Sequence, residues 1–286
     1  MLIVRKCSVK SEFYDKNATV YRDSEVVQKG YVIYFHGGGL LYGDREDLPQ
    51  LHLTTFTKAG YTIVAYDYPL APATKLDGIM DDVISSINDF RKQLEPADDP
   101  NLPVFLFGRS AGAYLALIAS VHPELTIKPA GIISFYGYGF LTDRWFEAES
   151  KYYNTLPKVP ETCISNVPSQ PHGSGDLETH FSLYVYARQT GKWKDLIYEG
   201  REKYFFSKYS LRLADKLPCP LLAAHSSGDS DVPFAEFLEL CSRYSPERFI
   251  AVSDEHDFDR HEDDPFTDKL LTSSVEFMNK AVSQQH

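Results

Sequence analysis

Six short, largely apolar runs, each four or five residues long, constrain the fold of this chain more than any other feature. They lie at residues 31–35, 61–65, 104–107, 131–135, 221–224 and 249–252. Runs that are apolar throughout, without a polar residue at every second position, are typical of strands buried on both faces. The runs therefore predict a parallel sheet with helices packed on each side.

Helix-like stretches separate several of these runs. Residues 77–94 carry a single apolar stripe at spacings of three and four, made of Ile79, Val83, Ile87 and Phe90. Residues 112–120 are small and apolar nearly all round, and residues 264–282 have the pattern of an amphipathic helix. Alternation of this kind predicts an α/β fold with a mostly parallel, doubly wound sheet and helices on both faces. Ahead of it, residues 2–9 and 18–20 predict an edge hairpin around residues 15–17.

Residues 140–213 interrupt the alternation. This stretch holds both tryptophans, Trp145 and Trp193, and many tyrosines and phenylalanines. Because a structureless loop of that length is improbable in a compact domain, we expect an inserted, partly helical, aromatic-rich subdomain within one domain of residues 1–286. Two interpretations stay open: a lid over a substrate site, or an insertion whose aromatic side chains form only its own core.

Charge and cysteine usage exclude several classes of protein. The chain has 29 basic and 40 acidic residues, a net charge of −11, and no long run of Lys or Arg, so we expect no nucleic-acid partner. No stretch approaches the roughly 18 apolar residues of a membrane helix, and Arg5 and Lys6 interrupt the first apolar run, so we expect a cytoplasmic protein without stable membrane association. Four scattered cysteines without CxxC spacing fit a reducing compartment.

The sequence Gly108-Arg109-Ser110-Ala111-Gly112 joins the third apolar run to the helix-like stretch 112–120. A GxSxG between a strand and a helix is the context in which this motif carries a nucleophile. Glycines permit the sharp turn, which lifts the Ser110 hydroxyl above the sheet edge, and the helix N-terminus favours developing negative charge. The motif predicts Ser110 as a nucleophile, against the alternative of a simple glycine-rich turn.

A second glycine motif, His36-Gly37-Gly38-Gly39, follows the first apolar run. Consecutive glycines let backbone N–H groups approach a ligand closely, as the oxyanion of an acyl transfer requires. A phosphate-binding turn is the alternative, but the motif lacks both GxGxxG spacing and a P-loop lysine.

Candidate partners for the serine follow the last two runs. Asp229 is our candidate for the carboxylate that orients a histidine, with Asp231 as its rival. His256 is the candidate general base, with His261 as the nearest competitor. Since the carboxyl ends of parallel strands share one edge of a sheet, these side chains are expected to meet Ser110.

These motifs, in the order Ser110, Asp229, His256, resemble the α/β-hydrolase superfamily. The stretch Tyr66-Asp67-Tyr68-Pro69-Leu70-Ala71-Pro72, followed by Asp81-Asp82-Val83, is similar to the Y-x-L-A-P…D-V pattern of hormone-sensitive-lipase-like carboxylesterases. The resemblance implies the α/β-hydrolase fold, a catalytic triad of those three residues, and an oxyanion hole formed by the amides of Gly38, Gly39 and Ala111. Arg109 departs from the acidic residue frequent in the family, and two roles stay open for it: pairing with a carboxylate of the insertion, or facing solvent.

The expected function is hydrolysis of a small-molecule carboxylic ester, with short or aromatic acyl groups, through an acyl-enzyme and without metal or organic cofactor. Two alternatives remain: an amidase, arylformamidase or small peptidase on the same scaffold, and a non-catalytic binding module. The rate is expected to fall as the pH drops through roughly 6.5, the ordinary pKa of histidine. The oligomeric state stays open between a monomer and a homodimer.

Overall fold

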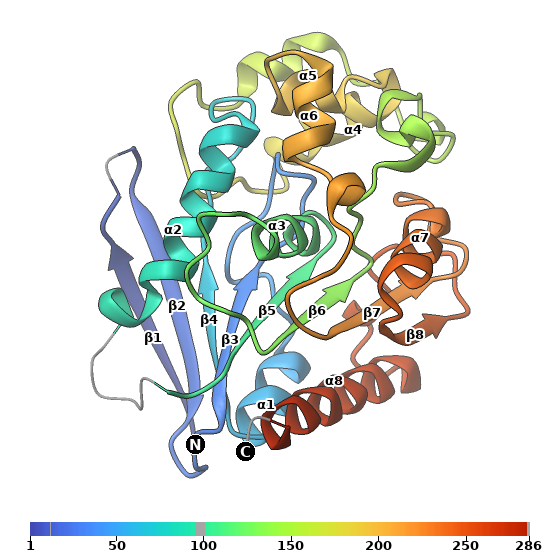
Figure 1. Cartoon of the computed structure of the whole chain (residues 1–286). Coiled ribbons are helices and arrows are strands. Elements are labelled where there is room, and N and C mark those ends of the chain that lie inside the picture. The colour runs from blue at the N-terminus through green and yellow to red at the C-terminus, as the bar shows by residue number, and fades with distance from the viewer. Residues whose placement is uncertain (12, 95–100, 285–286) are drawn as a thin grey trace.

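The computed structural model describes residues 1–11, 13–94 and 101–284 (Figure 1). Its centre is an eight-stranded sheet with the strand order β1-β2-β4-β3-β5-β6-β7-β8. The strands run Leu2–Val9 (β1), Lys16–Asp23 (β2), Gly30–Phe35 (β3), Tyr61–Tyr66 (β4), Val104–Arg109 (β5), Gly131–Phe135 (β6), Leu221–Ser226 (β7) and Glu247–Ala251 (β8). β3 to β8 pair in parallel, and β1 and β2 add an antiparallel edge, so the predicted mostly parallel sheet is confirmed.

Helices cover both faces of the sheet. Side chains of β3 alternate between two cores, with Ile33 and Phe35 in one and Val32 and Tyr34 in the other. The first core packs against α2 (Leu76–Leu94), α3 (Ala111–Ser120) and α7 (Phe234–Tyr244). The second packs against α1 (Gln50–Lys58) and α8 (Pro265–Ser283). The fully apolar runs predicted this two-sided burial.

The edge hairpin differs from the sequence-based prediction. β2 begins at Lys16, which pairs with Val9, so Lys16 and Asn17 lie in the strand and not in the turn. The reason is the buried Lys16 ammonium, which donates to the Asp82 carboxylate at 2.7 Å and to the Ser86 hydroxyl at 2.6 Å. This contact with α2 draws the start of the strand inward.

Residues 140–213 form a set of short helices above the carboxyl ends of the parallel strands (Figure 1). They comprise η1 (Thr142–Glu147), η2 (Tyr153–Thr155), η3 (Glu161–Asn166), α4 (His180–Thr190), α5 (Trp193–Ile197), α6 (Glu202–Lys208) and η4 (Leu211–Leu213). Their aromatic side chains pack on one another: the ring of Phe146 lies 5.8 Å from Trp193 and 5.9 Å from Phe205. A last short helix, η5 (Phe258–Arg260), precedes α8. Across the ranges given above, no helix is both long enough and apolar enough to pass through a bilayer.

Candidate active site

Ser110 occupies the sharp turn between β5 and α3. Its backbone has φ 52° and ψ −118°, a strained conformation for a residue with a side chain. The turn is close-packed, since a Cβ at Gly108 would overlap the backbone of Gly112, and a Cβ at Gly112 would overlap the Phe35 carbonyl oxygen. Only glycine fits at both positions, which is the physical reason for the GxSxG spacing.

His256 lies on the loop after β8 and bridges the other two predicted side chains. Its Nε2 accepts a hydrogen bond from the Ser110 hydroxyl at 2.8 Å, and its Nδ1–H donates to the Asp229 carboxylate at 2.7 Å. This protonation of the ring follows from the partners, because an ionised carboxylate can only accept. The structure thus brings Ser110, His256 and Asp229 into one hydrogen-bonded chain.

Asp229 is held in place by its own loop. Its Oδ1 accepts from the backbone N–H groups of Asp231 and Val232 at 2.8 and 2.9 Å, which leaves Oδ2 for His256. Burial raises the pKa of this carboxyl, but the charge of His256 and the hydrogen bonds from His225 and His256 hold the pKa well below its usual range. The group is therefore an anion facing the imidazole at neutral pH.

The same contact changes the basicity of His256. Burial lowers the pKa of the imidazole, but the charge and hydrogen bond of Asp229 outweigh burial and raise the pKa to about 9. A histidine of this kind is a stronger base than a free imidazole, because its protonated form is stabilised by the buried anion.

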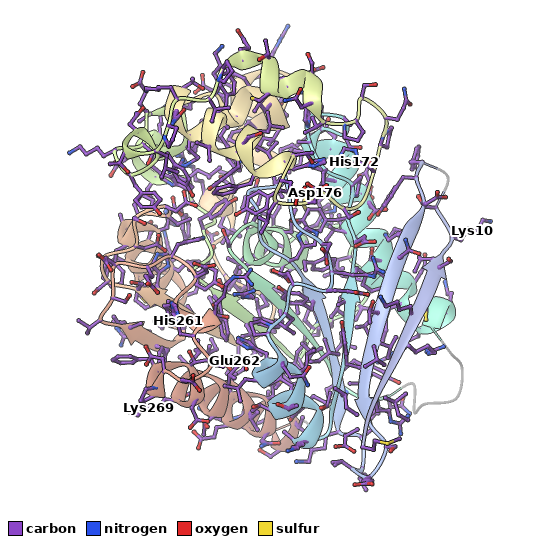
Figure 2. All side chains as sticks on the ribbon, turned by 180° about the vertical axis from the view of Figure 1, so that it is seen from behind. Lys10, His172, Asp176, His261, Glu262 and Lys269 are labelled. Atoms are coloured by element: carbon purple, nitrogen blue, oxygen red, sulfur yellow. The ribbon has the colours of Figure 1, made fainter. Side chains whose placement is uncertain are left out.

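The two rival residues bond to other partners. The Asp231 carboxylate turns towards the inserted segment, where it accepts from the hydroxyls of Tyr184 at 2.7 Å and Tyr153 at 3.1 Å. His261 lies on the loop before α8 (Figure 2), where its exposed imidazole pairs with the Glu255 carboxylate. In the described part of the chain, neither rival shares a hydrogen bond or ion pair with Ser110 or His256.

Backbone amides of the glycine loop and of the start of α3 lie near the serine. In residues 1–11, 13–94 and 101–284, no hydrogen bond uses the N–H of Gly38, Gly39 or Ala111 as a donor. Gly38 and Gly39 adopt φ values of 102° and 59°, and Ala111 is the first residue of α3. The Tyr184 ring packs so closely on Gly39 that a Cβ there would overlap it. Free donors at a helix N-terminus and a glycine turn are suited to an anion.

The inserted segment is hydrogen-bonded to this glycine loop at two places. The Trp193 indole N–H donates to the Gly39 carbonyl oxygen at 2.7 Å. Gly43 and Gly175 exchange two backbone hydrogen bonds of 2.8 and 3.0 Å. Neither contact was predicted from the sequence. The concentration of aromatic residues in 140–213 was a signal for the first, and no local pattern indicates the second.

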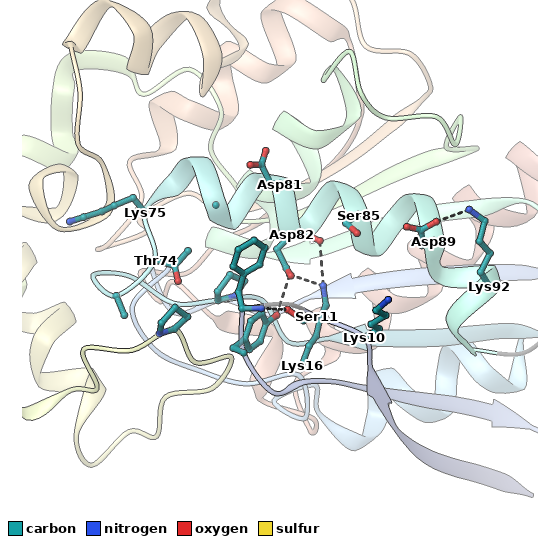
Figure 3. A pocket seen from close by; sticks show the side chains of 16 residues that line it. Lys10, Ser11, Lys16, Thr74, Lys75, Asp81, Asp82, Ser85, Asp89 and Lys92 are labelled. Atoms are coloured by element: carbon teal, nitrogen blue, oxygen red, sulfur yellow. Dashed lines mark hydrogen bonds and ion pairs between the residues drawn. The ribbon is translucent and has the colours of Figure 1, made fainter.

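A cavity of about 40 Å³ adjoins the Ser110 hydroxyl. The glycine loop lines this cavity together with acidic and basic side chains and three tyrosines. These lining side chains are Tyr42, Asp47, Arg109, Tyr136, Tyr184, Asp231, His256, Asp257 and Arg260. By the same measure a single water molecule needs about 10–15 Å³, so the cavity has room for only a small group. A separate cleft of about 700 Å³ lies between the end of the β1–β2 hairpin and α2 (Figure 3), and none of the predicted site residues lines it.

Arg109 takes neither of the two roles considered for it. Its side chain is 1% exposed, and within residues 1–11, 13–94 and 101–284 none of its hydrogen bonds goes to a carboxylate of the inserted segment. It donates instead to Asp259 and Asp47, which lie on the loops after β8 and β3. Neither acidic residue stands in a motif, so no local pattern could have identified them as its partners.

Comparison with known proteins agrees with this architecture. A family model for the alpha/beta hydrolase fold matches residues 32–165. A protein with unknown function from Staphylococcus aureus is 30% identical and superimposes with a TM-score of 0.83, over 98% of this chain and 99% of that one. An alpha/beta hydrolase superfamily protein from Enterococcus faecalis is 27% identical, with a TM-score of 0.81 over 97% and 99% of the two chains.

More distant structures share the fold. An esterase from Pyrobaculum calidifontis is 16% identical and aligns over all of this chain and 85% of that one, with a TM-score of 0.66. One assignment agrees with the sheet order, with the family match and with the similarity to the Staphylococcus and Enterococcus proteins. The chain belongs to the α/β-hydrolase superfamily.

Proposed function

We propose that this protein is a serine hydrolase that cleaves carboxylic esters with short acyl groups. The observation that carries the proposal is the hydrogen-bonded chain from Ser110 through His256 to Asp229, with links of 2.8 and 2.7 Å. A hydroxyl, a base and an orienting carboxylate in this order are what nucleophilic acyl transfer requires.

In the proposed mechanism, Ser110 Oγ attacks the ester carbonyl carbon as His256 Nε2 takes the hydroxyl proton. The carbonyl oxygen becomes an oxyanion, which the N–H groups of Gly38, Gly39 and Ala111 stabilise. Losing one donor of this kind costs about 3–4 kcal/mol of barrier in related chemistry. The imidazolium then gives its proton to the departing alkoxide, which leaves an acyl group on Ser110. Water activated by His256 attacks this acyl-enzyme, releases the carboxylic acid and restores the serine.

The acyl preference rests on the space beside the serine. The cavity of about 40 Å³ accommodates an acetyl-sized group, and Tyr184, packed on Gly39, narrows it on the side of the inserted segment. In this proposal, residues 140–213 act as a lid that covers the substrate site. Longer acyl chains would have to displace its aromatic side chains, which overpacks a close-packed region.

A labelling and substrate panel tests the proposal. A fluorophosphonate should attach covalently to Ser110, as read by mass spectrometry of the digested protein. Among acetyl, butyryl and octanoyl esters of one alcohol, kcat/KM should be highest for acetyl and about 10-fold or more lower for octanoyl.

Other results would identify the alternatives. An aryl formamide or aminoacyl amide hydrolysed faster than every ester would favour an amidase. Absence of labelling, together with absence of turnover on the whole panel, would overturn the proposal and leave the binding module.

The pH profile follows from the raised pKa of His256. A protonated imidazole cannot accept the serine proton, so the rate should rise as the pH increases through that pKa. The midpoint of this acid limb of kcat/KM should lie above 6.5 and towards about 9, higher than the sequence alone led us to expect. Initial rates between pH 5 and pH 10 would measure it, with the unfolding temperature recorded at each pH as a control. A midpoint at or below 6.5 would contradict the stabilisation of the imidazolium by Asp229.

A further inference from the structure

A buried ion pair lies beside the active-site cavity and joins the end of β5, next to Ser110, to the segment after β8 that carries His256. Arg109 donates from Nε to Asp259 Oδ2 at 2.9 Å and from Nη2 to Oδ1 at 3.0 Å. The Asp259 side chain is fully buried and Arg109 is 1% exposed. Two parallel hydrogen bonds fix the relative orientation of the two groups as well as their distance.

Two further side chains complete the environment of Asp259. The Tyr136 hydroxyl donates to Oδ1 at 2.6 Å, and the His52 Nε2–H donates to Oδ2 at 2.7 Å. Burial raises the pKa of Asp259, but the Arg109 guanidinium and His52 outweigh it and hold the pKa below its usual range. Counting the bonds from Arg109, Tyr136 and His52, each carboxylate oxygen of Asp259 accepts two hydrogen bonds, and these four bonds fix the orientation of the side chain.

The positions of these residues in the chain connect the pair to the chemistry. Arg109 immediately precedes Ser110, and Asp259 lies in η5, three residues after His256. Tyr136 contacts both His256 and Asp259. Its ring centre lies 4.7 Å from that of His256, and its hydroxyl donates a hydrogen bond to Asp259. A shift of either segment would thus stretch the ion pair as well as the contact between the serine and the histidine.

We propose that the Arg109–Asp259 ion pair positions the His256 loop against the serine turn, so that Ser110 Oγ and His256 Nε2 stay in hydrogen-bond contact. The inference rests on the proposed function. It gives Arg109 and Asp259 a role through other residues, since neither contacts Ser110 Oγ or the His256 imidazole. The cation at this motif position is thereby explained by the acidic residue it meets across the sheet edge.

Energetics favour a positioning role over a purely stabilising one. The cost of removing two charges from water largely cancels their attraction, so a buried ion pair is weak support for stability by itself. The effect of position on the rate is much larger than this effect on stability, because a displacement of about 1 Å in a reacting group can cost about 100-fold in rate. A bidentate pair between the two loops opposes such a displacement directly.

Asp259→Asn is the principal test. The amide keeps the size of the side chain but turns one acceptor into a donor that faces Arg109 or its neighbours. We expect kcat on the best ester to fall by about 10- to 100-fold with KM nearly unchanged, and the rate of fluorophosphonate labelling to fall in parallel. Active-site titration would refer each rate to folded enzyme.

The matched control is Asp82→Asn, in the buried Lys16–Asp82 pair beside the hairpin cleft (Figure 3). That pair is also short, at 2.7 Å, with side chains 3% and 11% exposed, but it touches neither loop of the active site. We expect Asp82→Asn to lower the unfolding temperature while kcat stays at the wild-type value. A merely structural role for Asp259 would make the two variants behave alike, with kcat per folded enzyme unchanged, and would overturn the inference.

Tyr136→Phe serves if Asp259→Asn does not fold. It keeps the ring against His256 and removes only the hydroxyl bond to Asp259, so kcat should fall by about fivefold at constant KM. Unchanged kcat in this variant would also overturn the positioning role. Failure of the proposed function gives a different result, because the wild-type protein would then neither hydrolyse esters nor take the label.

Discussion

Replacing Ser110 with alanine is expected to abolish ester hydrolysis and leave the fold intact. In well-studied serine hydrolases the loss of the nucleophile lowers kcat by about 10⁶-fold. The change removes one hydroxyl and keeps the Cβ, so the backbone at φ 52° carries the same strain in both proteins. The measurement is kcat on the preferred ester, with the circular dichroism spectrum and unfolding temperature as checks on folding.

Ser227→Ala provides the control for this variant. Ser227 is exposed on the loop after β7, outside the lining of the cavity, and its loss should change neither activity nor labelling. Hydrolysis retained by Ser110→Ala at more than a small fraction of the wild-type rate would mean that another group carries the reaction.

The second large effect is expected for Asp229→Asn. An amide cannot stabilise the imidazolium as an anion does, and it allows the other tautomer of the ring, so kcat should fall by about 10⁴-fold. The acid limb of the residual activity should also move to lower pH. In the wild-type protein the charge of Asp229 raises the pKa of His256, and without that charge the burial of the imidazole lowers it.

Measurement of the full pH profile of this variant separates the two effects. Asp254→Asn, an exposed residue of the loop that carries His256, controls for the change of one unit of charge. Wild-type kcat in Asp229→Asn, or an acid limb that does not move, would show that Asp229 does not orient the base.

The sheet could be predicted because its strands are buried on both faces. Each of the six apolar runs overlaps one parallel strand. One glycine-rich motif follows β3 directly and the other begins in the last two residues of β5. The contact of Ser110 with His256 and Asp229 could be expected for the same reason, since parallel strands deliver their carboxyl ends to one edge. The periodicity of residues 77–94 likewise indicated α2, because its apolar stripe faces the sheet.

Other features depend on contacts between distant residues and left no local signal. Arg109 and Asp259 are 150 positions apart, and neither the motif around the serine nor the residues near His256 indicate that they meet. The helices α1 and α7 were not predicted, although α7 does carry a local signal, with Phe234, Phe237, Cys241 and Tyr244 at spacings of three and four. Within α1, polar residues such as His52 and Thr57 are buried, so its apolar pattern is weak. The start of β2 was misjudged because a lysine that reads as a turn residue has a buried carboxylate partner.

The bond from the Trp193 indole to Gly39 has a consequence for redesign of this enzyme. Exchanging the region from 140 to 213 for the corresponding region of a relative is an obvious way to transplant selectivity. Here the exchange would also delete the indole N–H that bonds the Gly39 carbonyl oxygen, and the backbone pairing of Gly43 with Gly175 would be lost with it. A chimera would therefore have to bring its own support for the glycine turn. Without that support, the proposed mechanism leads us to expect a loss of turnover on every substrate alike.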